Sequence, residues 1–142
     1  MTMGIWDDDG FANDEALDWL ARVDPAEGLA PLRQLMHAVT LAPEPALDPR
    51  QAAHLFAAVE LMAAAGGRPH PALPLAARQW NAARREDPDP DDLILATRAL
   101  DFVGTSSALA ELWSQRPDEA AWHAELDDLR MRLTPPPETI FL

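Results

Sequence analysis

The chain contains no cysteine, no lysine and no tyrosine, and each absence restricts what the protein can be. Without cysteine it has no disulfides, no thiolate zinc site and no cysteine nucleophile, and this is compatible with a reducing compartment. All 11 basic residues are arginine, against 24 acidic residues, so the formal net charge is -13. Because such a charge repels phosphate, we expect no nucleic-acid binding by the chain as a whole. It favours a basic protein partner or a cation, or serves only to keep the protein in solution.

Long apolar runs are also lacking. The most apolar stretch, residues 52–65, is interrupted by His54 and Glu60 and is too short to span a bilayer. The N-terminus has no basic segment followed by an apolar run, so we expect no secretory signal. We therefore predict a cytoplasmic protein that does not associate with membranes. A length of 142 residues is sufficient for one domain with a real core.

Apolar residues recur at helical spacing along most of the chain, and no alternating run is long enough to predict a strand. The spacing predicts four helices in the first part of the chain, over residues 14–23, about 29 or 31 to 41, 49–65 and 74–85. It predicts three more helices after them: one from the end of the acidic linker to about residue 103, a short one that starts at Ser106 or Ser107, and a last one from the turn at 116–118 to about residue 133. The predicted fold is all-α, a single compact domain of six or seven short helices in an orthogonal or solenoid-like bundle. We assign residues 1–134 to this domain, including an irregular acidic N-terminal arm at residues 3–13. A proline-rich C-terminal tail covers residues 135–142.

The first helix and its continuation carry local start and stop signals. Asn13 is predicted to cap the first helix, and Asp14 in the first turn complements the helix dipole. Asp18 and Arg22 are spaced for a favourable ion pair, one turn apart. Residues 24–27, D-P-A-E, look like a capping box, but Gly28 and a proline three residues later favour a turn before the next helix.

Two acidic segments are candidate binding surfaces for a basic partner. The first, residues 3–20, contains six carboxylates, two tryptophans and a phenylalanine, and no basic residue. The second is the proline-rich linker at residues 86–92. The predicted contact residues are Trp6, Asp7, Asp8, Asp9, Asp14, Glu15, Asp18, Asp87, Asp89, Asp91 and Asp92. Two alternatives stay open, since the acids are also explained by solvation alone, and Trp6 by a role as a core anchor.

The same acids raise the question of a metal site. An EF-hand loop that began at Asp7 would place Phe11 at position 5 and Ala12 at position 6, where an oxygen ligand and glycine are required. An irregular divalent-cation site remains open as an alternative, and its candidate ligands are Asp7, Asp8, Asp9 and Asp14. Our prediction is that the protein has no metal site and no cofactor.

No catalytic motif is present, and we predict no catalytic residue. The sequence has no G-x-S-x-G elbow and no glycine-rich nucleotide loop. The histidines lie in different predicted elements without metal-ligand spacing, which favours solvated or partly buried helix positions: His37, His54, His70 and His123. Four tryptophans lie on apolar stripes, where core packing explains them: Trp19, Trp80, Trp113 and Trp122.

Residues 3–20, M-G-I-W-D-D-D-G-F-A-N-D-E-A-L-D-W-L, resemble the opening of a bacterial family catalogued as a domain of unknown function, number 4259. Its members begin roughly M-G-x-W-x-x-G-x-F-x-N-D-x-A-x-D-W-L, and the chain departs from this pattern at residues 9 and 10. Residues 107–113 are similar to the family's S-E-L-x-E-L-W, and the last helix to its W-x-x-x-L-x-x-L-x-x-x-L. The resemblance extends over residues 3–133 and implies a small, free-standing bacterial protein, without assigning an activity. The motif positions are Gly4, Trp6, Phe11, Asn13, Asp14, Asp18, Trp19, Trp113 and Trp122.

Three functions remain open. We favour a non-enzymatic binding protein, such as an immunity or inhibitor protein whose acids neutralise a basic toxin or nuclease. The second is a divalent-metal-dependent enzyme that uses the N-terminal carboxylates as ligands and histidines as bases. The third is an acidic helical scaffold with no catalytic role.

Overall fold

The computed structural model describes residues 11–40, 49–104 and 119–134, and within these ranges the chain is helical with no strand. The predicted all-α class is confirmed. The predicted helix at Ser106 or Ser107, the tail at 135–142 and all but the last three residues of the arm at 3–13 lie outside the described residues. The helices are α1 (Phe11–Leu20), the short 3₁₀ helix η1 (Pro25–Glu27), α2 (Ala30–Thr40), α3 (Pro49–Ala65), α4 (Leu75–Ala83), α5 (Pro90–Gly104) and α7 (Glu119–Leu133).

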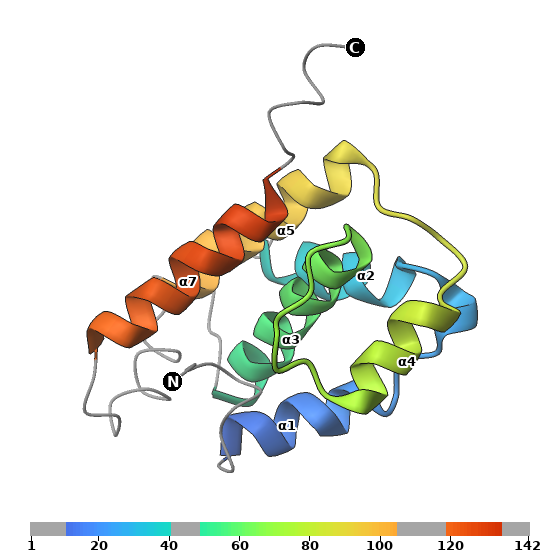
Figure 1. The fold of residues 1–142 in the computed structure, drawn as a ribbon, viewed down its shortest axis with the longest axis horizontal. Coiled ribbons are helices and arrows are strands. Elements are labelled where there is room, and N and C mark those ends of the chain that lie inside the picture. The colour runs from blue at the N-terminus through green and yellow to red at the C-terminus, as the bar shows by residue number, and fades with distance from the viewer. Residues whose placement is uncertain (1–10, 41–48, 105–118, 135–142) are drawn as a thin grey trace.

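Helix α3 is the centre of the domain. It lies in the middle of the ribbon in Figure 1 and contacts α1, α2, α4, α5 and α7. Every side chain from Leu55 to Ala65 is buried, because this segment is apolar or small on all faces apart from Glu60. In a solenoid each unit would contact only its neighbours. Of the two predicted arrangements, the bundle is therefore the one observed.

Helices α5 and α7 run side by side in opposite directions along one side of α3 (Figure 1). Leu129 and Leu133 of α7 are buried, as the spacing of the last helix predicts. Among the predicted core tryptophans, Trp80 is buried and Trp19 is partly buried against the core. The side chains of Trp113 and Trp122 lie outside the described residues. No described helix is both long and apolar enough to cross a membrane.

Helix α1 begins and ends earlier than the sequence predicts. Asn13 is its third residue, so the prediction that Asn13 caps it is wrong. The helix penalty of asparagine is only a few tenths of a kcal/mol, and burial of Ala16 and Leu20 outweighs it. At the other end, the N–H of Arg22 bonds to a carbonyl three residues back, which tightens the chain into a turn. The predicted Asp18–Arg22 ion pair is replaced by a bond from Arg22 Nε to the backbone oxygen of Asp18 at 3.4 Å.

The turn predicted between α1 and α2 is confirmed. Asp24 caps η1, because its Oδ1 accepts from the N–H of Ala26 at 2.9 Å. Gly28 follows with a φ of +66°, which glycine adopts without strain. Helix α2 then starts at Ala30, and Leu29 at its N-cap offers no side-chain acceptor.

Candidate functional site

The structure divides the predicted contact residues into two groups. Trp6, Asp7, Asp8 and Asp9, together with the motif residue Gly4, lie outside the described residues. The remaining candidates belong to α1 and to the linker between α4 and α5: Asp14, Glu15, Asp18, Asp87, Asp89, Asp91 and Asp92.

On α1, Asp14 and Asp18 are exposed and lie one turn apart on one face. Glu15 instead lies toward α3, where its Oε1 is 3.0 Å from His54 Nε2 and 3.4 Å from Arg50 Nε. Its side chain is only 17% exposed. Glu15 therefore attaches α1 to α3, while Asp14 and Asp18 are exposed to solvent.

In the linker, Asp92 is buried and belongs to an internal ion pair with Arg33 of α2. Arg33 Nε donates to Asp92 Oδ1 at 2.7 Å, and its Nη2 donates to Oδ2 at 2.8 Å, a two-pronged geometry that gives strong charge-assisted bonds. These bonds from Arg33 lower the pKa of Asp92 below its ordinary value, although burial opposes them. The Asp92 carboxylate is thus used inside the domain.

Glu86, in the linker between α4 and α5, completes this cluster and caps the start of α2. Its Oε2 accepts from Arg33 Nη2 at 2.6 Å, and its Oε1 accepts from the N–H of Leu29 at 3.0 Å. The bond from Arg33, then that from Leu29, lower the pKa of Glu86. Gly28 makes room for the carboxylate, because a Cβ at this position would lie 2.6 Å from Glu86 Oε1.

Sequence reasoning missed Arg33 and Glu86. A signal was present, since the start of α2 lacks Ser, Thr, Asp or Asn at its N-cap and its free N–H groups need an acceptor from elsewhere. Which acid supplies that acceptor depends on how α2 packs against the linker, and the local sequence pattern does not predict this packing.

The other linker acids are less enclosed. Asp89 is the N-cap of α5 and forms a reciprocal capping box with Asp92, with bonds of 2.9 and 3.0 Å. Asp87 is 89% exposed and lies 3.2 Å from Arg84. Asp91 is exposed. The linker therefore offers Asp87 and Asp91 to solvent and uses Asp89 and Asp92 for its own structure.

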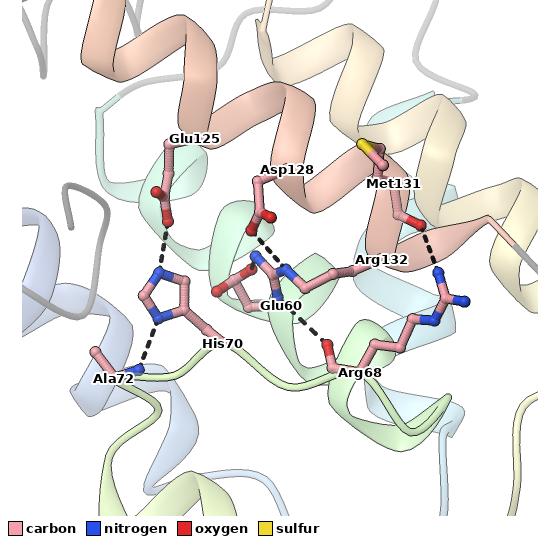
Figure 2. A network of polar contacts seen from close by, with 8 residues as sticks. All are labelled: Glu60, Arg68, His70, Ala72, Glu125, Asp128, Met131 and Arg132. Atoms are coloured by element: carbon pink, nitrogen blue, oxygen red, sulfur yellow. Dashed lines mark hydrogen bonds and ion pairs between the residues drawn. The ribbon is translucent and has the colours of Figure 1, made fainter.

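A second polar cluster joins α7 to α3 and to the loop that follows α3 (Figure 2). Arg132 Nη2 donates to Glu60 Oε1 at 2.8 Å, and its Nε donates to Asp128 Oδ2 at the same distance. Glu60 is 1% exposed, so its charge is compensated almost entirely inside the protein. Burial lowers the pKa of Arg132, but the combined effect of Glu60 and Asp128 outweighs it and raises this pKa above its ordinary value. Arg68 adds bonds to the carbonyls of Met131 and Thr134.

His70 is the neighbouring member of this cluster (Figure 2). Its Nε2 lies 2.7 Å from Glu125 Oε1, and its Nδ1 accepts from the N–H of Ala72 at 2.9 Å. Since Nδ1 is an acceptor, the ring proton belongs on Nε2 and points to the Glu125 carboxylate. The hydrogen bond to Glu125 raises the pKa of His70, and burial opposes it. Both ring nitrogens are occupied and the ring is buried, which is the arrangement of a structural histidine.

The described residues contain no cluster of three or more histidine, aspartate or glutamate side chains that could hold a metal ion. Of the candidate ligands, only Asp14 lies within these ranges. His37 is exposed, while His54 and His70 each face one glutamate. The described part of the site is therefore an arrangement of internal ion pairs and exposed carboxylates.

Half of the ten described arginines form ion pairs with acids of the same chain. Arg33, Arg50, Arg84, Arg130 and Arg132 each contact at least one carboxylate of their own domain. Asp14 and Asp18 have no such arginine partner among the described residues. Asp14 and Asp18 are therefore exposed carboxylates whose charge no described arginine neutralises.

The fold and this charge pattern define a small, strongly acidic helical domain with an internally neutralised core. The chain belongs to the family described as Domain of unknown function (DUF4259), whose family model matches residues 4–125. The resemblance carried by the opening motif is thereby confirmed. Comparison with curated proteins and with solved structures finds no match.

Proposed function

We propose that this protein is a non-enzymatic binding protein that neutralises a basic partner, in the manner of an immunity or inhibitor protein for a basic toxin or nuclease. One observation carries the proposal. Asp14 and Asp18 lie exposed on one face of α1, and no arginine of the described residues forms an ion pair with either carboxylate, in a chain with a net charge of -13.

The different positions of the acids on α1 support a contact role for the face that carries Asp14 and Asp18. Glu15 fixes the helix to α3 through His54 and Arg50, so the position of the neighbouring acids is set before a partner arrives. A helix that is already held in place loses little backbone freedom when a partner binds to it. Long-range attraction between an acidic protein and a basic one also accelerates their encounter.

Capture from a lysate of the source cells tests the proposal. Tagged protein is loaded at low salt, washed at stepwise higher salt, and the released proteins are identified by mass spectrometry. We expect a basic protein that is released as the salt concentration rises, because exposed charge pairs are screened over about 10 Å at 0.1 M salt.

Two matched double variants make the test specific. Asp14→Asn with Asp18→Asn removes two charges from the exposed face of α1, and Asp101→Asn with Asp127→Asn removes two from α5 and α7. Capture is expected to fail for the first pair and persist for the second. Capture of no basic protein, or equal capture by both variants, would count against the proposal.

A further inference from the structure

A groove of about 380 Å³ lies between the N-terminal half of α5 and the end of α7. Along α5 it is lined by Pro90, Leu93, Ile94, Thr97 and Arg98, which recur at the spacing of one helix face. Leu133 and Thr134 close it at the end of α7. Because α7 ends at Leu133, no helix of the described residues covers this face of α5.

The lining is almost entirely apolar. Ile94 is 50% exposed, which is unusual for an isoleucine in a chain with this much charge. The hydroxyl of Thr97 donates to the carbonyl of Leu93 at 2.9 Å, and that of Thr134 donates to the carbonyl of Arg130 at 3.0 Å, so both hydroxyl protons are already engaged by the backbone. Ligand sites of this size are typically apolar with a few placed polar groups.

Arg98 is the placed polar group. Its side chain is exposed, and no acid of the described residues forms an ion pair with it. Asp101, one turn further along α5, is engaged by Arg130. In a domain where Arg33 and Arg132 are bound by buried carboxylates, a free guanidinium beside an apolar groove selects for an anion.

We propose that this groove binds an apolar molecule that carries one carboxylate, with the carboxylate on Arg98 and the apolar chain along α5 toward Pro90. The distance between these two positions is about 12 Å at a rise of 1.5 Å per residue, which suits a medium-chain fatty acid. This site is separate from the acidic face of α1, and it does not depend on the function proposed above.

Decanoate is the probe, titrated into the full-length protein by calorimetry and observed by NMR. We expect saturable binding, with intermolecular contacts from the decanoate chain to the methyl groups of Leu93, Ile94 and Leu133. Arg98→Gln is expected to weaken binding about tenfold, since a charge-assisted bond is lost. Arg78→Gln is the matched control, because Arg78 is also exposed but lies on α4, away from the groove.

Further comparisons separate the proposal from non-specific adsorption. Decanol and decyltrimethylammonium have the same chain without the carboxylate, and both are expected to bind more weakly than decanoate. Ile94→Asp places a negative charge in the groove and is expected to abolish binding while the far-UV circular dichroism stays helical. Equal binding by the Arg98 and Arg78 variants, or no contact to the groove methyls, would overturn the proposal. Binding detected only after removal of residues 135–142 would also overturn it, because this result would mean that the C-terminal segment of the chain blocks the groove in the full-length protein.

Discussion

At the scale of single residues, the guanidinium of Arg33 connects segments that are distant in sequence. It binds Asp92 at the start of α5 and Glu86 in the linker, and Glu86 in turn caps α2. The contact acids predicted in the linker thus include one, Asp92, whose environment is internal. Spacing alone did not distinguish it from exposed Asp91, its neighbour in the chain.

Asp92→Asn should lower the free energy of unfolding by about 1–3 kcal/mol, because it weakens two charge-assisted bonds in a partly buried pair. Urea unfolding at neutral pH measures the change. Asp91→Asn removes the same charge one residue earlier, at an exposed position, and should stay within about 0.5 kcal/mol of the wild type. Equal effects at the two positions would contradict the assigned role of Asp92.

The same pair predicts a pH dependence. The folded pKa of Asp92 is lowered, mainly by Arg33, from its ordinary value of 3.8. The stability that it contributes is therefore fully present above the unfolded pKa and is lost as the pH falls through the folded pKa. The difference in stability between the wild type and Asp92→Asn should shrink as urea unfolding is repeated from pH 6 down to pH 3. A difference that stayed constant over this range would refute the linkage.

Gly28→Ala should destabilise the protein by more than about 1 kcal/mol, because alanine is strained at a positive φ. The added Cβ would also displace Glu86 from the start of α2. Gly67 gives the control, since its φ is +93° but a Cβ there would meet nothing within 4 Å. Thermal unfolding of Gly28→Ala and Gly67→Ala should show the larger loss at position 28. A loss at position 67 as large as that at 28 would leave the displacement of Glu86 without support.

At the scale of helices, the sequence predicted the apolar partners well and the polar partners poorly. The buried stripe of α3 and Leu129 and Leu133 of α7 follow from helical spacing. The start of α1 could not be predicted from the sequence, because a favourable cap residue such as Asn13 can also lie inside a helix whose apolar face is buried. Glu60 interrupts the apolar run of α3, and only the docking of α7 reveals that Arg132 neutralises it.

The docking of α7 gives a prediction at this scale. Glu60→Leu should cost about 3 kcal/mol, since it leaves Arg132 with reduced compensation in a largely buried position. Adding Arg132→Met should restore most of this loss, because an apolar pair of similar volume avoids both desolvation penalties. Denaturant unfolding of the two single variants and the double gives the coupling energy.

A double variant as unstable as the sum of its single changes would show that the pair does not couple α7 to α3. Asp128→Asn is the control for this cycle. Asp128 binds the same guanidinium but is 55% exposed, so its loss should cost less than about 1 kcal/mol.

At the scale of the whole molecule, the balance of charge is the feature on which the proposed function rests. Five of the ten described arginines form ion pairs with carboxylates of the chain, while Asp14 and Asp18 are exposed without such a pair. The sequence was sufficient to predict the negative sign of the net charge and the family. The family model confirms the family over residues 4–125. The sequence could not predict that Glu15 and Asp92 would lie inward while Asp14 and Asp18 lie outward, because that depends on tertiary packing.

The most direct test of the proposed function is the rate of association with the captured basic partner, measured by stopped flow across a series of salt concentrations. We expect the association rate of the wild type to fall steeply as salt rises. The Asp14→Asn, Asp18→Asn double variant should associate more slowly at low salt and lose part of that dependence, and the Asp101→Asn, Asp127→Asn variant should keep more of the wild-type rate. A rate that does not change with salt, or one that both variants lower equally, would contradict a role for the acidic face of α1 in binding.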